Sequence, residues 1–119
     1  AQSNKKPSLN CQIIGQIAGA EMLMRQIPWN SLEDSIKKLN GDAASLTLIH
    51  HAYQYPLVSR SADFDEVNYK IELKEVNDEF ELKYKSICQE MQRTNPTADM
   101  DLLLELTTQA ARERYKVVF

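Results

Sequence analysis

The two cysteines of this chain lie far apart, with Cys11 near the start and Cys88 in the last third. Widely separated cysteines in even number indicate a disulfide if the chain is exported, whereas in a reducing cytosol both would be buried thiols. We expect the disulfide. It requires the segment around Cys11 to pack against the segment around Cys88, which restricts the arrangements open to a short chain.

The scarcity of turn-forming residues favours long helices over many short strands. Only three glycines and four prolines occur among 119 residues, of which 43% are apolar. A chain of this length fits one domain with a core of its own. We therefore expect an all-α fold, a small helical bundle of about five helices with one long helix, crosslinked by one disulfide. Residues 1–8 are expected to form a flexible tail and residues 9–119 a single helical domain.

The first expected helix runs from about Leu9 to Gln26 and stops before Pro28, because the residue ahead of a proline leaves the helical region. Its apolar residues recur at helical spacing in two adjacent stripes, which predicts a central position in the bundle. One stripe comprises Ile13, Ile17, Ala20, Met24 and Ile27, and the other comprises Cys11, Ile14, Ala18 and Met22.

Capping residues mark the next two helices. Asn30 followed by Glu33 is typical of a capping box for a short helix over residues 31–39. Asp42 can cap a third helix, which ends before Pro56. Its inward-facing residues are expected to be Leu46, Ile49 and Tyr53.

A long helix is expected from a cap at Ser61 or Asp63 to about Arg93, a length of about 45 Å at about 1.5 Å per residue. The apolar stripe of this helix changes register part-way along. That change predicts a kink or a small break within residues 74–77.

Antiparallel packing of the first helix on the C-terminal half of the long helix would bring Cys11 beside Cys88. Such a bond closes a long loop, for which the chain-entropy estimate is about 4.5 kcal/mol. Thr97 or Asp99 then caps a last helix.

Two features of the first helix are candidates for function. Glu21 and Arg25, one helical turn apart, lie between the two apolar stripes. They form either a half-buried charge pair lining a ligand-binding or catalytic cleft, or an ordinary surface ion pair on a partly covered helix. Gly15 and Gly19 permit the close approach of another backbone, either within the molecule, which we favour, or in a homodimer.

No catalytic or metal-binding motif stands out in the sequence. His50 and His51 are adjacent, so their side chains diverge by about 100° on a helix and cannot share a metal ion. We expect one to face the core and the other water. A cysteine nucleophile would need a free thiol, which the disulfide removes. The sequence therefore predicts no enzyme activity, no cofactor and no metal site.

Acidic residues dominate the start of the long helix, where eight acids between positions 63 and 81 oppose Lys70 and Lys74. They form either a solvated helix face or a surface that attracts a basic partner. The aromatic residues Trp29, Tyr53 and Tyr55 either clip connections to the core, which we favour, or anchor a partner. The candidate partner-binding residues are Trp29, Tyr55, Asp65, Glu66, Glu72, Glu75 and Glu79.

Charge and hydropathy exclude two classes of partner. The net charge of -3 lacks the basic excess that binding to nucleic acid requires. The longest nearly apolar run, residues 13–24, is too short and too polar to span a bilayer.

The chain begins with Ala1 and Gln2, as after removal of a signal peptide, although a truncated chain would begin in the same way. We expect a bacterial protein of the periplasm, or a secreted one.

Several segments together resemble small exported bacterial proteins. They are the early Cys11, the helix ending in Arg25, the sequence Pro-Trp-Asn-Ser-Leu-Glu-Asp at 28–34, the stretch 53–56 and the late Cys88. Over about residues 9–91 the chain resembles uncharacterised periplasmic helical proteins with a disulfide. It is distantly similar to the helical immunity proteins that neutralise type VI secretion effectors.

This resemblance, the acidic surface and the crosslink imply a periplasmic protein-binding or inhibitor (immunity-like) protein without catalytic activity, whose partner is another protein. One alternative is a small-ligand-binding protein or an enzyme with a cleft around Glu21 and Arg25. A second alternative is a structural accessory of an envelope assembly.

Overall fold

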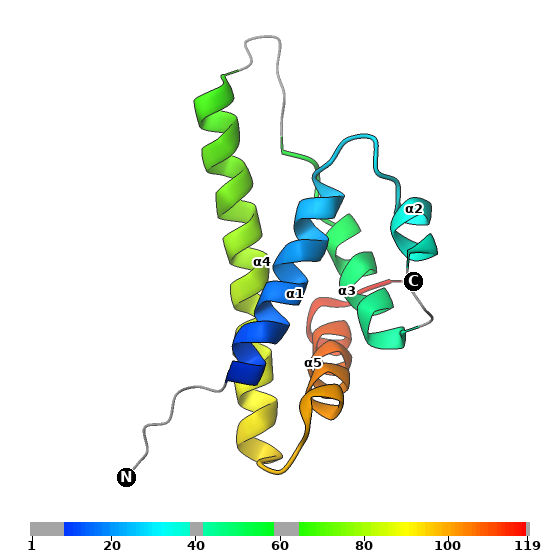
Figure 1. Ribbon diagram of the computed structural model, residues 1–119, viewed down its shortest axis with the longest axis vertical. Coiled ribbons are helices and arrows are strands. Elements are labelled where there is room, and N and C mark those ends of the chain that lie inside the picture. The colour runs from blue at the N-terminus through cyan, green and yellow to red at the C-terminus, as the bar shows by residue number, and fades with distance from the viewer. Residues whose placement is uncertain (1–8, 39–41, 59–64, 119) are drawn as a thin grey trace.

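The two cysteine-bearing helices lie side by side in a computed structural model of the chain (Figure 1). The structure describes residues 9–38, 42–58 and 65–118, so the expected tail over residues 1–8 lies outside the described residues. The described residues form no strand. They form the helices α1 (Leu9–Arg25), α2 (Leu32–Lys37), α3 (Ala43–Tyr53), α4 (Glu66–Thr94) and α5 (Met100–Tyr115). The predicted all-α bundle of about five helices with one long helix is confirmed.

The predicted disulfide joins Cys11, in the first turn of α1, to Cys88 in the last third of α4, with 5.4 Å between the two Cα atoms. As predicted, α1 runs antiparallel to α4 (Figure 1). A Cβ atom on Gly15 would lie 3.1 Å from the carbonyl oxygen of Glu81, and one on Gly19 would lie 3.1 Å from the Glu81 carboxylate. The glycines therefore serve close packing within the molecule, as predicted.

Aspartates begin three of the helices. Asp42 and Asp99 cap α3 and α5 as predicted, and each carboxylate accepts a hydrogen bond from a backbone amide of the first helical turn. The expected cap of α4 at Ser61 or Asp63 is wrong. Asp65 caps α4 instead, because its carboxylate accepts hydrogen bonds from the backbone amides two and three residues further on.

The capping box of α2 lies one residue further along the chain than predicted. Ser31 and Asp34 form it, and not Asn30 and Glu33. The Asn30 side chain is buried, and the carbonyl oxygen of Asn30 accepts a hydrogen bond of 2.8 Å from the Tyr53 hydroxyl. Asn30 therefore holds the connection between α1 and α2 against α3.

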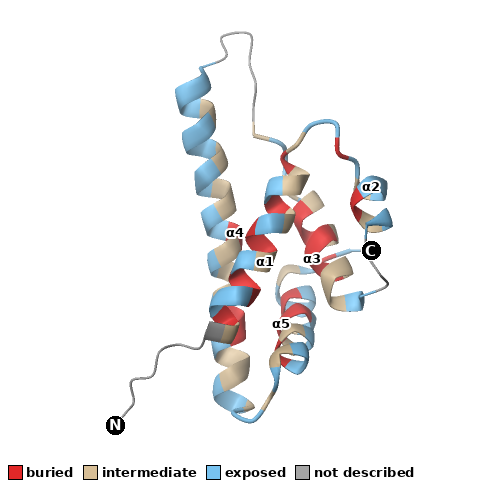
Figure 2. Ribbon diagram, viewed as in Figure 1, coloured by how far each residue is buried: buried red, intermediate tan, exposed pale blue. Residues whose placement is uncertain are grey.

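Only one of the two apolar stripes of α1 is buried. The helices α3, α4 and α5 all pack on the same side of α1, which leaves the opposite side open to solvent (Figure 2). The predicted central position is thus wrong for the stripe that begins at Ile13, in which Ile13 and Ala20 are exposed. The buried stripe is Cys11, Ile14, Ala18 and Met22.

The core lies between α1, α3, α5 and the C-terminal half of α4. α4 runs without the predicted break at residues 74–77. α3 buries a wider face than predicted, because it packs between α1 and α5. Of the residues predicted to face inward, Ile49 is buried, but Leu46 and Tyr53 are only half-buried. None of the described helices, not even the 29 residues of α4, is apolar enough to cross a membrane. The largest fully buried side chains include Ile14, Met22, Leu48, Ile49, Phe80, Tyr84, Ile87 and Leu103.

Candidate functional site

α4 is much longer than the helix that packs along it. The antiparallel register that pairs Cys11 with Cys88 places Arg25, the last residue of α1, level with residue 74 of α4. Residues 66–73 therefore extend past the end of α1 by about 12 Å, at about 1.5 Å per residue. Figure 1 shows this part of α4 above the end of α1. We call residues 66–73 the free end of α4.

Negative charge gathers on and beside the free end. Part of it is neutralised, because Glu66, Asp78 and Glu79 each contact a lysine one helical turn away on α4. Glu72 and Glu75 form no ion pair with any described residue, and the same holds for Asp65, which caps α4, and for the half-buried Glu81. The acidic residues predicted for partner binding are all exposed, namely Asp65, Glu66, Glu72, Glu75 and Glu79.

Large apolar side chains are exposed between these acids. Val67 is 66% exposed, Ile71 is 50% exposed and Leu82 is 61% exposed. Their helical spacing places them on the side of α4 opposite to the core residues Phe80 and Tyr84. Apolar side chains grouped on one solvent-facing side are typical of a protein-docking surface.

The exposed side of α1 adjoins this side of α4, since the two helices are in contact along their length. It carries no charged residue and exposes the apolar side chains of Ile13 and Leu23. We call the combined surface the α1–α4 face. Its exposed residues include Gln12, Ile13, Gln16, Ala20 and Leu23 on α1, and Val67, Ile71, Glu72, Lys74, Glu75, Asp78 and Leu82 on α4, where Lys74 and Asp78 form an ion pair.

Trp29 and Tyr55 have opposite environments. Trp29, in the connection from α1 to α2, is 81% exposed, so the expectation that it clips this connection to the core is wrong. Tyr55 does clip a connection, because its ring meets the edge of Phe80 at 5.4 Å between centroids and its hydroxyl accepts a hydrogen bond from Lys83. Tyr55 lies close to one of the predicted acids of α4, because the Lys83 ammonium contacts both the Tyr55 hydroxyl and, at 3.6 Å, the Glu79 carboxylate.

Glu21 and Arg25 are half-buried but form no ion pair with each other. Instead, the Arg25 guanidinium donates two hydrogen bonds, of 3.0 and 2.8 Å, to the carbonyl oxygen of Tyr55 and stacks over the Tyr53 ring at 4.9 Å. Burial raises the pKa of the Glu21 carboxyl, and the positive charge of Lys38 opposes this rise. Arg25 thus holds the end of α3 against α1, which explains its place beside the apolar stripe.

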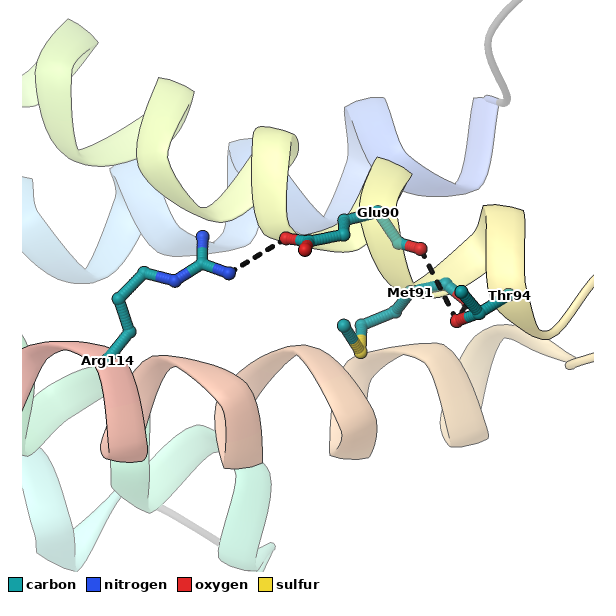
Figure 3. A network of polar contacts seen from close by, with 4 residues as sticks. All are labelled: Glu90, Met91, Thr94 and Arg114. Carbon is teal, nitrogen blue, oxygen red and sulfur yellow. Dashed lines mark hydrogen bonds and ion pairs between the residues drawn. The ribbon is translucent and has the colours of Figure 1, made fainter.

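The basic end of α5 is tied to α4. The Arg114 guanidinium donates a hydrogen bond of 2.8 Å to the Glu90 carboxylate, and this bond lowers the pKa of Glu90 (Figure 3). One turn further along α4, the Thr94 hydroxyl donates to the carbonyl oxygens of Glu90 and Met91. Both charged groups are partly exposed, so the pair orients the two helices more than it stabilises them.

An aromatic cluster surrounds His51 between α3, α4 and α5. His51 is buried, and its Nδ1 atom lies 2.7 Å from the Tyr84 hydroxyl oxygen. Four rings lie 5.0 to 5.7 Å from the His51 ring, between centroids. His50 lies nearer the surface and is only half-buried, so the expected divergence of the two histidines is confirmed. The four rings belong to Tyr55, Phe80, Tyr84 and Tyr115.

We expect the protein to lose stability as the pH falls from about 6.5 to about 4. Burial, and after it the positive charge of Lys83, lower the pKa of His51 from 6.5 to about 4. Between pH 6.5 and 4, His51 therefore binds a proton in the unfolded chain but stays neutral in the folded chain. His51 thus contributes stability fully above pH 6.5, and on the order of 1–3 kcal/mol is lost as the pH falls through the window. Urea unfolding followed by circular dichroism between pH 7.5 and 4 measures the loss.

Glu21 acts with the opposite sign, because a raised pKa in the folded state lowers stability as the pH rises above 4.5. The measurement is therefore made in a Glu21→Gln background. His51→Gln should flatten the pH dependence of stability, and His50→Gln should leave it unchanged. If His51→Gln and its parent show the same pH dependence, the prediction is wrong.

No model of a protein family matches this chain, and comparison with curated proteins and with solved structures also finds no match. Among the described residues, no group of three or more histidine, cysteine, aspartate or glutamate side chains is arranged to hold a metal ion.

Proposed function

We propose that this chain is an exported protein-binding protein of the inhibitor (immunity-like) type, which acts without catalysis and holds another protein on its α1–α4 face. The observation that carries the proposal is the free end of α4, where Val67 and Ile71 are exposed close in sequence to Glu72 and Glu75, two acids that form no ion pair with any described residue. The apolar side chains supply surface that a partner can bury, and the acids determine the charge of that partner.

A basic protein surface with an apolar groove is the partner that fits this face. A projecting helix can lie in such a groove with its apolar side chains down and its acids against basic side chains at the rim. A second copy of the chain fits less well, since its own α1–α4 face offers the same acids and no surplus of basic side chains to pair with them.

The disulfide supports a periplasmic or secreted location. Disulfides persist in oxidising compartments, whereas thiols of cytosolic proteins are kept reduced. The bond between Cys11 and Cys88 also fixes the two helices that form the α1–α4 face. A surface held in its binding geometry loses less conformational entropy when a partner binds.

Reversing charge on and beside the free end is expected to weaken binding strongly. We predict that the variant E72K/E75K retains its partner at least about tenfold less well than the unaltered chain, because both reversals place like charges against a basic surface. The test is affinity capture from periplasmic extract at 50 and 500 mM salt, with the captured proteins quantified by mass spectrometry. Capture by the unaltered chain should also fall at the higher salt.

The matched control reverses two exposed acids elsewhere, Glu105 and Glu113 on α5, and changes the net charge by the same amount. This control should capture as much partner as the unaltered chain. Equal capture by E72K/E75K and the control, or no retained protein at low salt, would refute the proposed function.

A further inference from the structure

We propose that a second site, separate from the α1–α4 face, binds a carboxylate carried on an aromatic body. The site is a shallow depression of about 310 Å³ at the junction of α3, α4 and α5, broadly open to solvent. Its volume is at the lower end of the range of small-molecule sites. The pocket is lined by His51, Gln54, Tyr55, Pro56, Lys83 and Tyr115.

A single positive charge stands at the pocket. The Lys83 ammonium lies 5.1 Å from the centroid of the Tyr55 ring and 4.8 Å from that of the Tyr115 ring. It donates a hydrogen bond of 2.6 Å to the Tyr55 hydroxyl and lies 3.6 Å from the exposed carboxylate of Glu79. Since an ammonium has three donors, one remains for a bound anion.

Lys83 keeps its charge in this setting. Burial acts to lower the pKa of Lys83, but the hydrogen bond to the Tyr55 hydroxyl and the nearby Glu79 carboxylate raise it above its ordinary value. The rings on either side restrict where the ammonium can move. The ammonium is thus held at the pocket, whereas the ammonium of an isolated surface lysine moves freely in solvent.

The other polar groups of the pocket are also donors. Burial raises the pKa of the Tyr84 hydroxyl, so this hydroxyl keeps its proton. His51 Nδ1 is its only acceptor within the described residues, and the arrangement that satisfies this hydroxyl has Tyr84 donating to Nδ1 and the proton of the neutral ring on Nε2. The Gln54 oxygen already accepts a hydrogen bond of 2.7 Å from the Val118 amide, which leaves the Gln54 side-chain N–H groups as donors.

This combination of donors and flat apolar walls determines the class of ligand. An ammonium, an imidazole N–H and an amide N–H favour an anion with several acceptor atoms, such as a carboxylate. The tyrosine rings and the Pro56 ring favour a flat apolar body beside that carboxylate. Benzoate has both features, and benzamide has the same shape without the charge.

The test is a titration of the full ¹⁵N-labelled chain, disulfide intact, with benzoate and with benzamide, followed by ¹H–¹⁵N NMR. We expect benzoate to give saturable shifts at Gln54, Tyr55, Lys83 and Tyr115, with a dissociation constant of about 1–10 mM. Benzamide should bind at least about tenfold more weakly, because it lacks the charge that Lys83 recognises. Absence of saturation up to 50 mM benzoate, or equal shifts with benzamide, overturns the proposal.

Variants then locate the recognition at one side chain. Lys83→Met keeps the apolar stem and removes the ammonium, and should weaken benzoate binding at least about tenfold. Lys83→Gln is measured beside it in case the methionine disturbs the fold. The matched control, Lys70→Met, removes an exposed charge elsewhere on α4 and should bind benzoate like the unaltered chain. Unchanged binding by either folded Lys83 variant overturns the proposal.

Discussion

Replacing Cys11 and Cys88 with alanine is expected to lower the free energy of unfolding by up to about 4.5 kcal/mol, the chain-entropy estimate for this loop. The bond joins residues 77 positions apart, so it removes a large amount of freedom from the unfolded chain. A domain of this size has a total stability of only about 5–15 kcal/mol. We therefore expect the double variant to be close to unfolding at physiological temperature.

Equilibrium urea unfolding at 25 °C, followed by circular dichroism, measures this effect. The unaltered chain treated with a reducing agent is the control, because it loses the bond and keeps both cysteine side chains. Its stability should fall close to that of the alanine variant, and a difference between the two reports the packing of the buried sulfur atoms. A decrease of less than about 1 kcal/mol in both would show that the crosslink does little for stability.

Phe80→Ala is expected to destabilise the protein by about 3–5 kcal/mol, the usual range for removal of a fully buried aromatic side chain. Phe80 is fully buried, and its ring meets the rings of His51, Tyr55 and Tyr84 at 5.0 to 5.4 Å between centroids. Its removal would leave a cavity in the centre of the aromatic cluster. Urea unfolding of the disulfide-intact variant measures the loss.

Leu82→Ala is the matched control, since Leu82 lies two residues away on the same helix and is exposed. It should change stability by less than about 0.5 kcal/mol. The opposite ranking, with Leu82→Ala costing more than Phe80→Ala, would mean that α4 packs through its other side.

The helical architecture could be predicted because its signals are local or covalent. The caps at Asp42 and Asp99 need only their neighbours in the chain, and the bond between Cys11 and Cys88 requires the start of α1 to lie beside the last third of α4. The cap of α4 was misplaced because three candidate capping residues precede this helix within a few positions. Periodicity alone does not choose among them.

The burial of α1 could not be predicted, since both of its stripes have helical spacing and similar hydrophobicity. The decision depends on which side α3, α4 and α5 cover, which is a property of the whole bundle. For the same reason Ile13 was expected in the core and is exposed. The exposure of Trp29 could not be predicted either, because an aromatic residue in a connection can turn toward the core or toward solvent.

The sites follow the same distinction. The acids of α4 are close together in sequence, so their charge could be recognised there. How far α4 extends past α1 could not be predicted, because it depends on how the two helices align in the bundle. Arg25 could be singled out by its place among apolar residues, although its acceptor, the carbonyl oxygen of Tyr55, is a backbone group that no side-chain pattern marks. The aromatic pocket draws on α3, α4 and α5 and has no signal in any single segment.

Because α4 extends past α1, its two parts differ in how much they contribute to folding. Its C-terminal half carries the crosslink and the buried rings, so most changes there are costly to the fold. The first eight residues bury little, and substitutions among them should cost little folding stability. Under the proposed function, the residues that contact a partner can therefore change at that end while the rest of the fold stays constant, so that one fold can serve partners with different surfaces.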